Sequence, residues 1–203
     1  MSESEIREPV QKRSIETKDK IIEAGFDLIC HDGFYNTNTS KIAKKAGVST
    51  GIVYQYFKDK RDIFLAGLDK YADDIFYPMI DMPNISLNKS NLPTIMKDMI
   101  NKYINNHKLS QIAHEEITAM THSDKDVAYY FHKKDMEMTK RFSSILVTNN
   151  FKINNMDEKV HVVIGLIDNL CHEIVYHKHK ELDYDLMTDI VVNTIVDILT
   201  KND

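Results

Sequence analysis

The chain has 203 residues and a net charge of −5, with 42% hydrophobic and 28% charged residues. These proportions are typical of a globular protein that can bury one large core or two smaller ones. Its six glycines and four prolines argue against a turn-rich sheet protein and favour an all-α fold. No apolar run is long enough to span a bilayer, and the polar N-terminus lacks the apolar stretch of a signal peptide, so we expect no membrane partner.

The two cysteines, Cys30 and Cys171, lie far apart in separate helical patterns. We therefore expect no disulfide between them, and each is expected to be a small buried hydrophobic residue. This cysteine usage fits a reducing cytoplasm.

The first predicted element is a helix that runs from about Ser14 or Thr17 to His31. Gly25 lies within its apolar stripe, where a small residue lets another helix approach closely. Gly33 follows the last turn, the usual place for a glycine that ends a helix.

Residues 38–61 contain two short helical patterns separated by a turn with a glycine. Asn38 or Thr39 can cap the first helix, Gly47 lies where that helix ends, and Ser49 can cap the second. Two helices joined in this way form a helix-turn-helix, whose second helix enters the major groove of DNA.

The charge of this segment supports a DNA-binding role. Residues 39–61 hold six basic residues against the single acidic Asp59, a net charge of +5 in a chain that is acidic overall. Positive charge on one small element suits the neutralisation of DNA phosphates. A solvated helical hairpin with a chance cluster of lysines is the alternative explanation.

The segment AGVSTGIVYQYFKDKRDIF, from Ala46 to Phe64, resembles the signature of TetR/AcrR-family transcriptional repressors, whose usual form is AGVSxGTxYxYFxxKxxL. Ile52 departs from that form, because the family often has a threonine there that can contact a phosphate. The resemblance implies an all-α homodimer that binds double-stranded DNA through an N-terminal three-helix domain. It also implies a variable C-terminal helical domain that binds a small-molecule effector.

On this basis we predict a DNA-binding domain at residues 14–62 and an effector-binding and dimerisation domain at 63–203. A connecting helix at about 60–76 would link them. An effector that shifts this helix would release the operator, provided that it binds the DNA-incompetent arrangement better than the competent one.

Residue roles at the DNA follow from the same resemblance. Thr39, Lys41, Tyr54 and Lys60 are expected to contact phosphates. Thr50, Gly51 and Gln55 are candidates near base edges, where a glutamine can pair with adenine. Tyr56 is expected at a phosphate or a thymine methyl group, although Tyr54 and Tyr56 could instead pack against the core. The full predicted set of DNA-binding residues is Thr39, Ser40, Lys41, Ser49, Thr50, Gly51, Tyr54, Gln55, Tyr56 and Lys60.

Five more helices are predicted after the connecting helix, from Pro93 onward and at about 110–122, 124–148, 157–179 and 184–201. Their methionines and aromatic residues could line a cavity for an apolar or amphipathic effector, but side chains at this spacing also suit an ordinary core. The candidate pocket residues are Phe76, Met79, Met99, Tyr103, Met120, Tyr130, Met138 and Phe142.

The apolar stripes of the last two predicted helices are wider than one neighbour requires. Two such helices from each of two subunits would make a four-helix bundle, unless both faces are covered within one subunit. A dimer would read a palindromic operator with its two recognition helices. The candidate interface residues are Val163, Ile167, Leu170, Ile174, Ile190, Thr194 and Ile198.

Nine histidines leave a metal- or haem-sensing regulator of the same fold open as an alternative. The spacing of His172 and His177 is poor for two ligands on one helix, and the HExxH motif is absent, so we predict no metal site and no cofactor. No nucleophile or phosphate-loop signature indicates an enzyme or a catalytic residue. A helical binding protein that no longer reads DNA is the remaining alternative.

Overall fold

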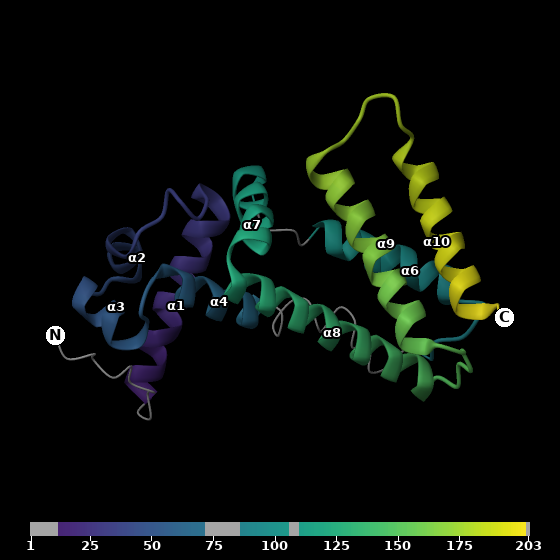
Figure 1. Cartoon of the computed structure of the whole chain (residues 1–203), viewed down its shortest axis with the longest axis horizontal. Coiled ribbons are helices and arrows are strands. Elements are labelled where there is room, and N and C mark those ends of the chain that lie inside the picture. The colour runs from purple at the N-terminus through teal and green to yellow at the C-terminus, as the bar shows by residue number, and fades with distance from the viewer. Residues whose placement is uncertain (1–11, 72–85, 106–109, 202–203) are drawn as a thin grey trace. The chain divides into compact units, whose positions relative to one another are not determined.

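The computed structural model describes residues 12–71, 86–105 and 110–201, which form nine α-helices and contain no strand (Figure 1). The all-α class predicted from the sequence is therefore confirmed. Within these ranges, none of the helices has the length and apolar character needed to cross a membrane. The described residues divide into two compact units, one formed by 12–71 with 110–130 and the other by 86–105 with 131–201.

The first unit contains five complete helices. They are α1 (Lys12–Asp32), α2 (Thr39–Ala46), α3 (Thr50–Tyr56), α4 (Lys60–Tyr71) and α7 (Gln111–Ser123). Helix α1 contacts α2, α4 and α7, and α2 contacts α3. Their apolar faces enclose a small core that holds the helix-turn-helix in place, made of Ile21, Ile22, Ala24, Ile42, Ala43, Val53, Phe57 and Ile63.

Gly25 allows the close approach that its position in α1 predicted. A Cβ atom at this residue would collide with the Ile63 side chain of α4 and lie 3.3 Å from Cδ1 of Ile42. Helix α1 can therefore pack tightly on α2 and α4 only without a side chain here. Gly33, just past the end of α1, has a φ of 90°, a conformation that favours glycine.

The caps of the helix-turn-helix follow the sequence prediction. The Asn38 side chain accepts a hydrogen bond from the Lys41 amide at 2.9 Å and so begins α2. Gly47 ends α2 in the left-handed conformation with a φ of 70°. The Ser49 hydroxyl accepts a hydrogen bond from the Ile52 amide at 3.3 Å and begins α3.

The second unit contains α6 (Leu92–Asn105), α9 (Met156–Tyr176), α10 (Tyr184–Thr200) and most of α8 (Lys125–Thr148). Helices α9 and α10 lie side by side, and both contact α6. The core of this unit is made of aliphatic, methionine and phenylalanine side chains that are almost fully buried, namely Leu92, Met96, Ile100, Phe142, Leu146, Val160, Val163, Leu170, Val192, Ile195 and Leu199.

The two compact units do not coincide with the predicted domains, because α4 and α7 belong to the same unit as the N-terminal helices. The predicted boundary after residue 62 also falls within α4. The assignment of function to residues 14–62 and 63–203 stays a prediction. Both cysteines are buried, as expected, and burial raises the pKa of the Cys171 thiol to about 12.

Candidate nucleic-acid interface

Two hydroxyl groups meet at the start of α2. The hydroxyl oxygen of Thr39, the first residue of α2, lies 3.0 Å from that of Tyr54 on α3. Both residues were predicted to contact phosphates, and their side chains come from different helices. One side of the helix-turn-helix therefore presents two hydroxyls next to the N-terminus of α2, where the helix dipole favours an anion.

Helix α3 has an exposed and a buried side. Gly51, Tyr54 and Gln55 are exposed, whereas Val53 is fully buried. The other predicted contacts of this segment are arranged around them: Ser40, Lys41 and Ser49 are exposed, while Thr50 and Tyr56 are partly buried. Tyr56 also packs against the core of the first unit, which favours the packing alternative for this side chain.

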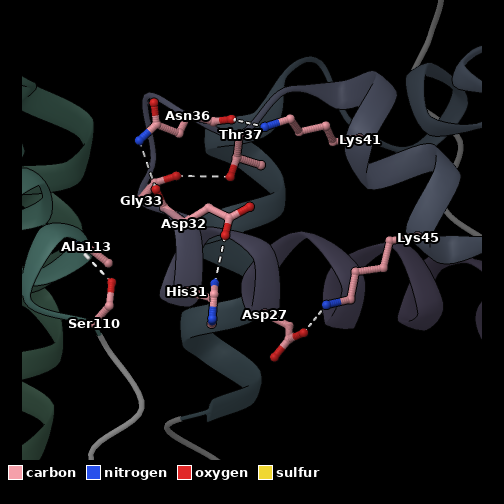
Figure 2. Close-up of polar contacts among 10 residues, drawn as sticks. All are labelled: Asp27, His31, Asp32, Gly33, Asn36, Thr37, Lys41, Lys45, Ser110 and Ala113. Atoms are coloured by element: carbon pink, nitrogen blue, oxygen red, sulfur yellow. Dashed lines mark hydrogen bonds and ion pairs between the residues drawn. The ribbon is translucent and has the colours of Figure 1, made fainter.

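The basic residues of the segment differ in what they contact. Lys45 pairs with Asp27 of α1, and Lys41 donates to the carbonyl oxygen of Asn36 at 2.8 Å (Figure 2). Lys44 and Lys58 are exposed and have no ion-pair partner among the residues that the structure describes. Lys44 and Lys58 are therefore available to neutralise phosphates.

Lys60 has an internal role that the sequence did not predict. Its ammonium group donates to the carbonyl oxygens of Phe34 at 2.6 Å and Thr37 at 2.8 Å, and it lies 4.2 Å from the centre of the Phe34 ring. Burial lowers the pKa of Lys60, and the charges of Glu116 and Asp59 partly oppose this effect. The geometry favours Lys60 as a support of the loop before α2 over the predicted phosphate contact.

That loop is built from short-range hydrogen bonds. The buried Thr37 hydroxyl donates to the Gly33 carbonyl at 2.9 Å, and the Asn36 amide group donates to the Asp32 carbonyl at 3.0 Å (Figure 2). The Asp32 carboxylate in turn lies 2.7 Å from Nδ1 of His31, which lowers the pKa of the aspartate. These contacts fix the path of the chain into the Asn38 cap and hence the start of α2.

The candidate pocket residues do not all belong to one unit. Met99 and Tyr103 pack against the second core, to which Phe142 belongs. The Tyr103 hydroxyl also donates to Asp168 at 3.2 Å. Met138 is in the second unit as well, whereas Met120 and Tyr130 belong to the first. Phe76 and Met79 lie outside the described residues.

The candidate interface residues fall into two groups. Val163 and Leu170 are buried in the core of the second unit, so this unit by itself already covers them. Ile190 is 54% exposed, Thr194 is exposed, and Ile167, Ile174 and Ile198 are partly buried. Val162 of α9 and Leu186 of α10, which are not among these candidates, add exposed apolar surface.

The histidines do not form a metal centre in the described part of the chain. Among residues 12–71, 86–105 and 110–201, no three His, Cys, Asp or Glu side chains lie together in a way that could hold a metal ion. His172 instead lies 3.2 Å from the Asp168 carboxylate on the same helix, and His179 lies 3.5 Å from Glu173.

The sequence of the helix-turn-helix is similar to that of known proteins. Residues 21–66 match the sequence model of the bacterial regulatory proteins of the tetR family. The fatty acid metabolism regulator protein of Bacillus subtilis is 25% identical over 192 residues, which cover 90% of this chain and 93% of that protein.

Solved structures share the fold over almost the whole chain. A TetR-family regulator from Mesorhizobium loti superimposes with a TM-score of 0.73 at 16% identity and covers 93% of this chain and 98% of its own. The fatty acid degradation regulator FadR from Bacillus halodurans has a TM-score of 0.59 at 19% identity, with coverage of 89% and 94%. The matched segment contains the whole helix-turn-helix, from the core of α1 to the middle of α4. Together, the sequence match and the shared fold support a TetR-family transcriptional regulator, a family of DNA-binding proteins and not of enzymes.

Proposed function

We propose that this regulator is a repressor that binds a palindromic operator as a homodimer and leaves it when a small apolar or amphipathic molecule binds the C-terminal part of the chain. The observation that carries the DNA-binding part is the pair of hydroxyls on Thr39 and Tyr54, 3.0 Å apart beside the exposed side of α3. A regulator of this kind acts in the cytoplasm, where the chromosome lies.

In this proposal, phosphate contacts position the protein and base contacts select the sequence. Thr39, Tyr54 and Lys41 bind phosphates at the start of α2, and Lys44 and Lys58 neutralise neighbouring phosphates. Gly51, Gln55 and Thr50 lie at base edges. Ser40 and Ser49 lie near the starts of α2 and α3 and contact the DNA beside them, whereas Tyr56 supports α3 from the core. Gln55 can form two hydrogen bonds to one adenine.

Dimerisation uses the exposed apolar strip of α9 and α10. Val162, Leu186 and Ile190 are all more than half exposed. Large aliphatic side chains on two adjacent helices lose water when the same pair of helices of a second subunit packs against them. Ile167, Ile174, Thr194 and Ile198 would extend that contact, whereas Val163 and Leu170 support it from the core.

The names of two relatives support a fatty acyl compound as the effector. The Bacillus subtilis relative is a regulator of fatty acid metabolism, and the structural relative from Bacillus halodurans is a regulator of fatty acid degradation. A fatty acyl chain is amphipathic, which fits the predicted ligand class, and the regulated genes would act in fatty acid metabolism.

The test is fluorescence anisotropy with a labelled duplex from the DNA that flanks the gene of this protein. The expected result is a complex with two subunits on one palindrome, tighter than the complex with a shuffled duplex at the same salt concentration. Fatty acids and fatty acyl thioesters of increasing chain length are then titrated into the complex. A dimeric protein that does not distinguish the two duplexes would contradict the DNA-binding proposal, and release by none of the acyl compounds would contradict the effector class.

A further inference from the structure

Asp124 lies at the junction of three helices. Its amide donates to the Met120 carbonyl at 2.9 Å and so closes α7. Its Oδ1 accepts hydrogen bonds from the amides of Asp126 at 3.0 Å and Val127 at 3.2 Å and so begins α8. Its Oδ2 accepts a hydrogen bond from Arg61 of α4 at 2.8 Å. A single residue therefore joins the end of α7 and the start of α8 to α4.

Arg61 belongs to the first turn of α4, directly after the turn that follows the recognition helix α3. The Asp59 side chain accepts the Arg61 amide at 2.8 Å and begins α4. Both terminal nitrogens of the guanidinium group bind a carboxylate: Nη1 binds Asp124, and Nη2 lies 3.1 Å from the Asp126 carboxylate. The side chains of Arg61 and Asp124 are 32% and 26% exposed, so this ion pair is less screened by water than those on the open surface.

Helix α7 is also attached to the helix-turn-helix at two other points. The Ser110 amide, which precedes α7, donates to the Cys30 carbonyl of α1 at 2.8 Å. Farther along, Oε2 of Glu116 accepts the Tyr35 amide at 3.1 Å. Tyr35 belongs to the loop whose carbonyl groups Lys60 also binds. The residue before α7 is therefore bound to α1, the middle of α7 to the loop before α2, and the residue after α7 to α4.

We propose that Arg61 and Asp124 are positioning residues for the recognition helix α3, and that α7 with the first turn of α8 is part of the DNA-reading unit of this regulator. This proposal rests on the proposed operator binding. The last residue of α3, Tyr56, is followed after three residues by α4, so the direction of the α4 first turn limits the orientation of α3. Arg61 holds that turn against the α7–α8 corner without touching DNA itself.

A positioning role affects sequence-specific binding more than non-specific binding. Base-edge contacts need α3 in one orientation, whereas contacts with phosphates tolerate several. Loss of the ion pair should therefore lower the affinity for the operator and leave the affinity for a shuffled duplex nearly unchanged. A residue that only adds stability would change the melting temperature and leave the ratio of the two affinities unchanged.

The main variant is Asp124→Asn, because asparagine keeps the capping oxygen of α8 while it removes the charge that Arg61 binds. Arg61→Lys is the second variant. It keeps the positive charge but cannot bind the carboxylates of Asp124 and Asp126 through two separate nitrogens. The matched control is Lys70→Gln, which removes another ion pair of α4, the one with Glu23 of α1. Fluorescence anisotropy is measured with the operator duplex and a shuffled duplex, and hydrogen–deuterium exchange is measured on the free protein.

For Asp124→Asn and Arg61→Lys we expect a loss of about tenfold in the operator-to-shuffled affinity ratio, which corresponds to about 1.4 kcal/mol. Lys70→Gln should leave that ratio unchanged. The amides of Val53 and Phe57 should exchange faster in Asp124→Asn than in the wild type, and those of Met96 and Ile100 in the second unit should not. An unchanged ratio in both variants would overturn the proposal.

The two readouts separate this proposal from the operator-binding proposal. If the wild-type protein itself fails to prefer the operator, the proposed function is overturned. The hydrogen–deuterium exchange measurement then tests the positioning role of the ion pair without the binding assay. In that case, unchanged exchange of Val53 and Phe57 in Asp124→Asn would overturn the positioning role too.

Discussion

The hydroxyl oxygen of Thr39 lies 3.0 Å from that of Tyr54, so that the first residue of α2 and the exposed side of α3 meet at one point. The two residues are 15 positions apart in the sequence. One hydroxyl donates its proton to the other, and the second hydroxyl is then free to donate its own proton to a phosphate oxygen. Each hydroxyl also orients the other before any DNA arrives.

The first prediction concerns this pair. Tyr54→Phe removes the phenolic hydroxyl but keeps the ring, and a hydrogen bond to a charged group contributes about 1.5–3 kcal/mol. We therefore expect affinity for the operator and for a shuffled duplex to fall alike by roughly tenfold or more in fluorescence anisotropy. Tyr129→Phe is the control, since Tyr129 is a 70% exposed tyrosine of α8. Equal binding by Tyr54→Phe and the wild type would remove Tyr54 from the phosphate contacts.

The second prediction separates the basic residues by their effect on salt dependence. Each phosphate contact by a cation contributes about 0.9 to the slope of log affinity against log salt concentration. Lys44→Ala and Lys58→Ala should each reduce the slope by about that amount, because neither lysine has a described ion-pair partner. Lys60→Ala should leave the slope unchanged, since its ammonium group binds Phe34 and Thr37. A reduced slope for Lys60→Ala would restore the phosphate role that the sequence predicted.

The third prediction concerns the proposed dimer. Ile190→Asp places a charge on the exposed apolar strip of α10, where Ile190 is 54% exposed. If that strip is the interface, burial of the charge should cost about 2 kcal/mol and raise the dimer dissociation constant by roughly thirtyfold in analytical ultracentrifugation. Ile112→Asp on α7 is a closely matched control, because Ile112 is also 54% exposed. An unchanged dimer in Ile190→Asp would exclude this part of α10 from the interface.

The fourth prediction is a pH dependence of stability. The hydrogen bond from Arg61, together with the amide of Val127, lowers the pKa of the Asp124 carboxyl below its ordinary value of 3.8. The stabilisation of the folded state by the ionised carboxylate is therefore fully present above pH 3.8. It is lost as the pH falls through the lowered pKa that Asp124 has in the folded protein. The difference in melting temperature between the wild type and Asp124→Asn should be constant near neutral pH and shrink in acid. A difference that stays constant down to strongly acid pH would contradict this account.

Local signals of the sequence predicted the helix-turn-helix closely. Gly47 and Ser49 were predicted as caps and occupy those positions, and of the two candidates for the first cap, Asn38 and Thr39, the structure has Asn38. These signals act within four residues, so they can be recognised without knowledge of the fold. The predicted end of α1 at His31 was nearly right, since α1 ends at Asp32, whereas its described part begins at Lys12, before the predicted Ser14 or Thr17.

Contacts between distant segments could not be predicted in this way. Arg61 and Asp124 are 63 residues apart, and Tyr35 and Glu116 are 81 apart. Nothing near Arg61 in the sequence indicates which carboxylate it binds, and a basic residue beside a DNA-binding motif is naturally interpreted as a phosphate contact. For the same reason, the sequence did not indicate that α7 contacts α1 and the loop before α2.

The discontinuity of the first unit also has a consequence for protein synthesis. The ribosome completes α1 to α4 well before Asp124, which follows Arg61 by 63 residues. At synthesis rates of about 5–20 residues per second, that interval is roughly 3 to 13 seconds. During this time Arg61 lacks its two carboxylates, and the Tyr35 amide lacks Glu116. The first unit of a nascent chain is therefore incomplete until residues 110–130 have been translated.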